Sequence, residues 1–296
     1  MPVPVLYAIV VLVWGSTWFA ISFQLGSVAE EMSVAYRFAI ASACLFVFAK
    51  CEGRKLSIAP RLYTFVVAQG LLMFSIAYVL VYLSSNYVTT GLIALLYSLI
   101  VIFNGALERL FYGTPFDARL AAASAVGLSG TAFVFWPEVS SLSLANNVVI
   151  GIVWTLISVL IAALGNMAAI RNTAKGIPVI LINAHGMLWG AGLSIILGLL
   201  MGRPLGFSLE WPYLASLAYL ALIGSCVAFG CSMALLKQIG AARASYASVL
   251  FPVVALLIST AFEDYRWTPA AVTGVALILG GNWLALSRVP ARQQKD

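Results

Sequence analysis

The sequence predicts an all-α integral membrane protein in which ten transmembrane helices form two inverted five-helix repeats around a central cavity. The first observation behind this prediction is composition: 62% of the 296 residues are hydrophobic and only 9% are charged, whereas about a quarter of the residues in soluble domains are charged. The second is a series of apolar runs, and the third is the placement of basic residues between them. A span needs about 20 apolar residues, so ten spans leave room only for short loops.

Ten apolar runs, bounded by Gly, Pro or charged residues, divide the chain into candidate spans. The runs cover residues 4–24, 33–49, 62–84, 89–111, 116–136, 147–170, 179–201, 211–236, 243–262 and 268–287. Each run must satisfy its own backbone hydrogen bonds in lipid, and a bundle of helices with short linkers does this more simply than a barrel. The first run has no basic region before it and is too long for a signal peptide, which indicates a retained first span.

Basic residues fall mainly on one side when the ten spans are threaded alternately through a membrane. Of the 16 Lys and Arg residues, all but three share one side, and the three exceptions are Arg37, Arg203 and Arg266. One missed span would swap every later loop and destroy this bias. Because basic loops stay in the cytoplasm, both termini are expected to be cytoplasmic, in the plasma (inner) membrane of a bacterium.

The two halves of the chain also resemble each other. Residues 95–115 align with residues 250–269, Glu108 meets Glu263 in this alignment, and both stretches reach a Thr-Pro before another helix rich in small residues. We therefore expect a first five-helix repeat over residues 1–140 and a second over 141–296. A unit of five spans is odd, so its second copy inserts upside down, as in transporters that alternate access to a midplane site.

Short motifs on three spans carry a family resemblance: Trp14-Gly15-Ser16, Tyr36-Arg37-Phe38, and Pro252 followed by Glu263. With the ten spans and the repeat, the chain resembles the ten-span type of the drug/metabolite transporter superfamily, with paired repeat domains. Within it, the sequence is most similar to bacterial exporters of aromatic amino acids. The resemblance implies a kinked ninth helix at Pro252, although the first half has Tyr97 at the matching position, so the kink is not expected to be symmetric.

The expected function is membrane transport, namely export of small hydrophobic solutes, such as aromatic and other neutral amino acids, by alternating access. A broad-specificity metabolite or drug efflux carrier is the alternative, and a channel is less favoured because no ring of like charges or carbonyl-rich filter is visible. The sequence contains no HExxH, no GxSxG and no carboxylate pair within a span, so an enzyme is not expected. Substrate identity, direction of flux and energy source stay open.

Aromatic and hydroxyl-bearing residues near the middle of the spans are the candidates for substrate binding. The candidates are Trp14, Tyr78, Tyr82, Tyr97, Ser98, Trp154, His185 and Tyr246, with Pro252 as a hinge. Tyr78 and Tyr82 are four residues apart and therefore share one helical face. Each could instead fill a gap between helices.

Arg37 and the single histidine each have a functional interpretation and a simpler structural one. Arg37 is expected just inside the outer edge of its span, where it could attract an anionic group, although extension to the lipid headgroups is the favoured alternative. His185 could sense protons or bind a carboxylate substrate, although a neutral ring bonded to a hydroxyl is favoured. Every Asp and Glu is expected at a span end or in a loop. Coupling to protons through an intramembrane carboxylate is therefore disfavoured.

No cofactor and no metal ion is expected, because the four cysteines lack metal-pair spacing and the chain has one histidine. The expected partners are a small-molecule substrate and the lipid bilayer. The basic residues lie in small groups between apolar runs, so no nucleic acid is expected. The oligomeric state stays open, and a monomer is compatible with the pattern.

Overall fold

In the computed structural model, the described residues are 1–296 without 27, 116, 137–145, 263–266 and 287–296, and their secondary structure is entirely helical. The α-helices are α1 (Val3–Ser22), α2 (Glu30–Cys51), α3 (Pro60–Leu71), α4 (Ala77–Ser84), α5 (Thr90–Tyr97), α6 (Ile100–Tyr112), α7 (Ala118–Val134), α9 (Asn146–Ala174), α10 (Val179–Leu200), α11 (Trp211–Tyr219), α12 (Ala228–Ile239), α13 (Ala241–Ser245), α14 (Phe251–Phe262) and α15 (Pro269–Leu286). Two π-helical segments, η1 (Leu72–Ile76) and η2 (Leu220–Val227), and a 3₁₀ segment, η3 (Tyr246–Leu250), join some of them.

Each of the ten apolar runs coincides with a helical stretch of the described chain. Eight helices there are long and apolar enough to cross a membrane. The other two apolar helices are shorter, Ala118–Val134 and Pro269–Ala285, and 17 residues rise only about 25 Å against a hydrocarbon core of about 30 Å. The repeat boundary at residue 140, Glu263 and Arg266 lie outside the described residues.

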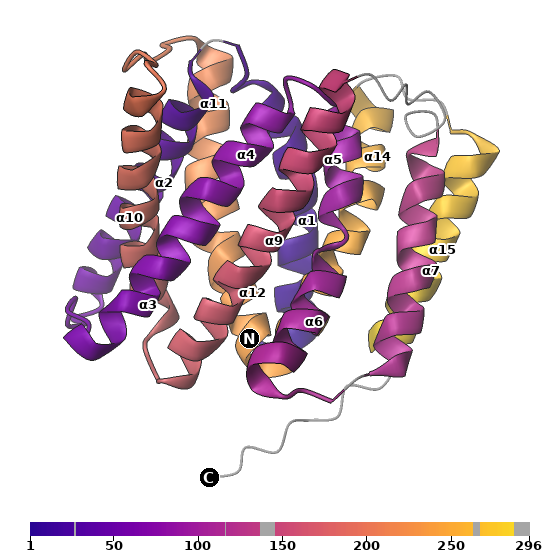
Figure 1. Cartoon of the computed structure of the whole chain (residues 1–296), viewed down its shortest axis with the longest axis horizontal. Coiled ribbons are helices and arrows are strands. Elements are labelled where there is room, and N and C mark those ends of the chain that lie inside the picture. The colour runs from indigo at the N-terminus through magenta and orange to yellow at the C-terminus, as the bar shows by residue number, and fades with distance from the viewer. Residues whose placement is uncertain (27, 116, 137–145, 263–266, 287–296) are drawn as a thin grey trace.

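The helices run up and down in a bundle, with the N-terminus at the same end as the turns that follow α2, α6 and α9 (Figure 1). Helices α2 and α10 pack side by side at one edge, and α7 and α15 pack together at the other. Helices α1, α9, α12 and α14 lie between these pairs (Figure 1). The interior of the molecule is therefore built by segments from both halves of the sequence.

Small residues allow the closest crossings. A Cβ atom added to Gly70 on α3 would lie 2.8 Å from the Cα of Gly186 on α10, and one added to Gly130 on α7 would lie 2.6 Å from the carbonyl oxygen of Gly274 on α15. The hydrophobic effect does not drive helices together in lipid, so close backbone packing and interhelical hydrogen bonds hold a membrane bundle together. Such bonds are present between Ser75 and Ser194, 2.8 Å apart.

The ninth predicted span changes helix type where a simple proline kink was expected. Pro252 is the second residue of α14, and the 3₁₀ segment η3 precedes it. Pro252 has no N–H to donate to the carbonyl of Ser248, which accepts from the N–H of Phe251 instead. The tighter 3₁₀ turn thus supplies a donor three residues on.

The first half has a comparable break although it has no proline there. Helix α5 ends at Tyr97, and the N–H of Leu99 donates to the carbonyl of Leu96, 3.0 Å away, before α6 begins at Ile100. The proline itself is not repeated, as the sequence indicates, but the break in the helix is present in both halves. A tightened turn interrupts both spans, with and without proline.

Candidate functional site

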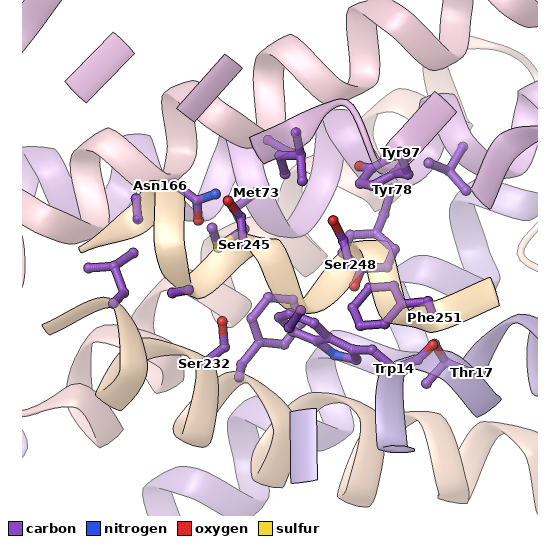
Figure 2. A pocket seen from close by; sticks show the side chains of 18 of the residues that line it. Trp14, Thr17, Met73, Tyr78, Tyr97, Asn166, Ser232, Ser245, Ser248 and Phe251 are labelled. Atoms are coloured by element: carbon purple, nitrogen blue, oxygen red, sulfur yellow. The ribbon is translucent and has the colours of Figure 1, made fainter. Parts of the chain in front are cut away.

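A cavity of about 120 Å³ lies in the middle of the bundle. Its walls come from helices of both halves, and Figure 2 shows Trp14, Tyr78, Ser248 and Phe251 arranged around the same space. The lining is aromatic, aliphatic and hydroxyl-bearing, without a charged side chain: Trp14, Thr17, Trp18, Ile21, Met73, Tyr78, Val81, Tyr97, Ile100, Ala162, Asn166, Phe229, Ser232, Met233, Leu236, Ala241, Ala244, Ser245, Ala247, Ser248 and Phe251. A cavity of about 150 Å³ can bind benzene, so this space approaches the size of one aromatic ring.

Edge-to-face contacts fix the rings that surround the cavity. The ring centroid of Trp14 lies 4.8 Å from that of Phe229 and 6.1 Å from that of Phe251. The indole N–H of Trp14 donates to the carbonyl of Gly224 in η2, 3.1 Å away. Because the polar edge of Trp14 is bonded away from the cavity, its ring offers an apolar surface to a solute.

Few polar groups remain free in the cavity wall. Ser158 donates to the carbonyl of Ala77 over 2.7 Å and so accepts from the hydroxyl of Tyr97, 3.0 Å away. Asn166 donates to Asn104. The hydroxyl of Ser248, in contrast, is buried without a hydrogen-bond partner, and it is therefore the hydroxyl best suited to bind a polar group of a solute.

The structure brings three of the eight predicted binding residues to this cavity, namely Trp14, Tyr78 and Tyr97. Tyr82 is fully buried beside the cavity, next to Arg37. Ser98 is also buried and donates to the carbonyl of Ala94 in its own helix. The shared face of Tyr78 and Tyr82 thus divides between the cavity and the packed interior.

The other three predicted residues lie elsewhere. Trp154 packs edge-on against Tyr87, and Tyr246 is buried where its hydroxyl donates to the carbonyl of Ala123 on α7. His185 lies between α2 and α3: its Nε2 is 2.8 Å from the carbonyl of Leu56 and its Nδ1 is 3.2 Å from the hydroxyl of Tyr63. A carbonyl only accepts, so Nε2 donates to Leu56, and Nδ1 meets the hydroxyl of Tyr63, a contact of the kind expected for this histidine.

Several cavity residues were not predicted, among them Phe229, Ser232, Asn166, Ser248 and Phe251. The sequence pattern could have indicated the lining residues of α13, η3 and α14, because they follow helical spacing: Ala241, Ala244, Ser245, Ser248 and Phe251. Residues three or four apart share one helix face. Small and hydroxyl-bearing residues on such a face leave space beside the helix.

One charged residue contradicts its expected place, and a second lies at a span end as expected but is buried. Arg37 has only 1% of its surface exposed, and Glu31 is fully buried with neither carboxylate oxygen hydrogen-bonded. The prediction that Arg37 reaches the headgroups was wrong, because its guanidinium turns inward over the rings of Tyr78 and Phe38. Helix α2 therefore carries charge into the interior of the bundle.

A second space of about 980 Å³ lies near the ends of α6 and α12 and the start of α7. Arg243 on α13 donates to Asp117 over 2.7 Å there. This hydrogen bond lowers the pKa of Asp117, and the N–H groups of Arg119 and Leu120 at the start of α7 add to the effect. Charged side chains and exposed ones such as Ile102 form part of its wall, so we take the uncharged aromatic cavity as the candidate site.

The profile of the EamA-like transporter family matches residues 2–136 and 149–287. The chain belongs to the EamA-like transporter family. This family assignment and the apolar helices make it a multi-pass membrane protein and a transporter. In the described part of the chain, no group of three or more His, Cys, Asp or Glu side chains is arranged to hold a metal ion.

Two relatives of this EamA-like chain are named as transporters, and a third is named only as a protein. It is 24% identical over 275 residues to an uncharacterized transporter, YoaV, of Bacillus subtilis, covering 92% of each chain. It is 27% identical over 277 residues to an uncharacterized inner membrane transporter, YedA, of Escherichia coli, covering 90% of this chain and 87% of YedA. The protein PagO of Salmonella typhimurium is 23% identical over 283 residues, with 94% and 89% covered.

A solved crystal structure shares the fold over nearly the whole length. The TM-score is 0.81 with 19% sequence identity, and the match covers 97% of each chain. The arrangement of helices is thus one that an experimentally determined protein also adopts.

Proposed function

We propose that this protein exports small solutes with an aromatic or similarly apolar body, including aromatic and other neutral amino acids, by alternating access. The observation that carries the proposal is the aromatic cavity, whose walls come from both halves of the chain: Trp14, Tyr78 and Tyr97 from the first and Phe229, Ser248 and Phe251 from the second. A solute held between two halves can face either side of the membrane as they rock against each other.

Several paired features support an arrangement of two inverted repeats over residues 1–140 and 141–296. The π-helical segments η1 and η2 interrupt corresponding predicted spans, the third and the eighth. The tightened turns at Leu99 and in η3 interrupt the fourth and ninth. Helix α2 packs on α10 and α7 on α15, which pairs the second span with the seventh and the fifth with the tenth. In this proposal Pro252, beside η3, is part of a hinge.

Transport in proteoliposomes tests this function. Proteoliposomes that contain unlabelled phenylalanine inside should take up labelled phenylalanine faster than proteoliposomes without internal phenylalanine do. The reason is that a carrier exchanges one solute molecule for another. Labelled leucine should exchange more slowly, and labelled glutamate should not exchange. Equal, non-saturating entry of all three would indicate a channel and contradict the proposal.

A broad-specificity efflux carrier is a second candidate, favoured by the uncharged lining of the cavity. Its substrates would be selected by apolar surface rather than by an amino-acid head group. Inhibition of phenylalanine exchange by unrelated planar apolar compounds, at concentrations similar to phenylalanine itself, would favour this candidate.

A further inference from the structure

Arg37 on α2 is a buried cation inside the bundle. Its Nε donates to the hydroxyl of Ser225 in η2 over 2.9 Å. The carbon of its guanidinium lies 4.8 Å from the ring centroid of Tyr78 and 5.2 Å from that of Phe38. Its Nη1 is buried without a hydrogen-bond partner. The guanidinium therefore contacts two aromatic rings and one hydroxyl, and the N–H groups of its Nη1 can still donate to a ligand.

No carboxylate neutralises this charge among the described residues, whose ion pairs are Arg54 with Glu52 and Arg243 with Asp117. Glu31 lies six residues earlier on the same helix, about 120° away around the axis and about 9 Å away along it. The Cβ of Glu31 packs near Gly198 of α10. An unpaired charge inside a membrane bundle is expensive and commonly functional, so an anion supplied from outside the chain is the natural partner of Arg37.

Arg37 lies directly behind the wall of the aromatic cavity. Tyr78 lines the cavity and also lies under the guanidinium. At Gly224, an added Cβ would lie 3.1 Å from Thr17, another cavity residue, and 3.4 Å from Nη2 of Arg37. One layer of side chains therefore separates the guanidinium from the aromatic cavity, and the hydroxyl of Tyr82 lies close to the same charge.

We propose that Arg37 binds the carboxylate of the transported solute and selects aromatic carboxylates and amino acids over aromatic amines. The inference rests on the proposed function and adds the head group to it. The apolar body of the solute occupies the cavity, and movement of the Tyr78 ring brings its carboxylate to Nη1. The planar fork of a guanidinium matches a carboxylate better than the point charge of an ammonium group does.

Competition against labelled phenylalanine exchange measures this selection. The competitors share one ring and differ in the head group: phenylalanine, phenylpyruvate, phenylalanine amide and phenethylamine. In the parent protein the two carboxylates should compete about tenfold better than the amide and the amine, the size expected of a charge-assisted hydrogen-bonded pair. Arg37→Gln should remove most of this difference, and Arg37→Lys should retain part of it.

Arg171→Gln is the matched control. Arg171 also lies over an aromatic ring, 3.4 Å from the centroid of Phe65, and also has an unpartnered Nη1, but it does not line the cavity. This variant should keep the parent's preference for carboxylates. A loss of preference in both variants would overturn the proposal.

Thermal stability in detergent separates ligand binding from a structural role, and it works even if a variant transports poorly. Phenylpyruvate should raise the melting temperature of the parent and of Arg37→Lys more than phenethylamine does, and this difference should vanish in Arg37→Gln. If Arg37→Gln does not fold, Ser225→Ala serves as a second variant, because it frees the guanidinium from η2 and keeps its charge. Phenylpyruvate should still stabilise this variant more than phenethylamine does, and loss of that difference would contradict the proposal. A carboxylate preference that survives in folded Arg37→Gln overturns the proposal. The proposal is also overturned if chloride alone stabilises the parent as much as phenylpyruvate does. Absence of phenylalanine exchange by the parent would instead contradict the proposed function.

Discussion

Tyr78 belongs both to the aromatic cavity and to the packing around Arg37. Neighbouring aromatic residues do not share this position: Tyr82 lies behind the cavity, and Tyr87 packs on Trp154. A substitution at Tyr78 therefore tests the cavity more directly than one at either neighbour.

We predict that Tyr78→Ala lowers the ratio of phenylalanine to leucine exchange about two- to tenfold, because a ring that stacks on the solute contributes about 0.5 to 1.5 kcal/mol beyond its burial. Tyr78→Phe keeps the ring and should retain most of the ratio. Tyr87→Ala is the control and should leave it unchanged. An unchanged ratio in folded Tyr78→Ala would assign this residue to packing.

Asp117 gives a second prediction at the residue scale. Because Arg243 lowers its pKa in the folded protein, Asp117 stabilises the fold fully above its unfolded pKa of about 4, and this contribution is lost as the pH falls through the lower, folded pKa. Asp117→Asn should therefore reduce the melting temperature in detergent near pH 7, and the difference from the parent should shrink as the pH falls below about 4.

Glu52→Gln is the control for that measurement, since the Glu52 and Arg54 pair is more exposed and such pairs contribute about 0 to 1 kcal/mol. It should change the melting temperature little at either pH. A constant difference between Asp117→Asn and the parent at all pH values would mean that the ion pair does not act through its charge.

Individual residues show how far sequence reasoning reaches. The choice of Trp14, Tyr78 and Tyr97 followed from ring chemistry near the middle of a span, and all three line the cavity. Ring chemistry could not separate them from Tyr246, because that separation depends on which neighbouring helix each face meets. For the same reason the inward turn of Arg37 was missed, since only Tyr78, Phe38 and Ser225 together make burial of its charge tolerable.

At the scale of elements, a carboxylate of one helix holds the start of another. Glu108 on α6 accepts from the backbone N–H groups of Ala241 and Ala242 on α13, over 2.7 and 3.1 Å. Negative charge at the first turn of a helix satisfies donors that have no partner within the helix. The fourth and ninth predicted spans are thus joined at one end of the bundle.

We predict that Glu108→Gln lowers the free energy of unfolding by about 1 to 3 kcal/mol, because the amide group turns one accepting oxygen into a donor that faces an N–H. Thermal melting in detergent measures the change, and the ratio of phenylalanine to leucine exchange should stay that of the parent. Glu30→Gln, at an exposed site where the carboxylate accepts from Asn86, is the matched control. A changed exchange ratio with unchanged stability would give Glu108 a direct role in transport.

The helical elements themselves were largely predictable, because length and apolar composition determine them in lipid. Breaks within elements were less so. Proline indicated the change at η3, whereas η1 and η2 contain no proline and were not foreseen. Tertiary contacts accompany one of them, since η2 supplies the carbonyl of Gly224 to Trp14 and the hydroxyl of Ser225 to Arg37.

On the scale of the whole molecule, the bundle has two ends that differ in charge. The described basic residues near the turns after α2, α6 and α9 include Arg54, Lys55, Arg109 and Lys175, and these turns lie at the same end as the N-terminus (Figure 1). Arg203 follows α10, which runs from that end to the other.

We predict that the end with the N-terminus is cytoplasmic, since basic loops are retained there. In a protein without its four native cysteines, a cysteine placed at Ser208 should react with an impermeant maleimide added to intact cells, and one placed at Lys175 should react only after the membrane is opened. The reverse labelling would invert the orientation. Labelling of both positions in intact cells would contradict a membrane-spanning α10.

The π-helical segment η1 has a consequence for how chain length can vary among related sequences. In η1 the N–H of Ala77 reaches back five residues to the carbonyl of Leu72, so this turn contains one residue more than an α-helical turn does. Loss of one residue between Leu72 and Ile76 can be absorbed by return to the regular i→i+4 pattern, with Gly70 still against α10 and Tyr78 still at the cavity. Single-residue insertions and deletions in the third span should therefore concentrate in η1. By the same geometry, those in the eighth span should concentrate in η2.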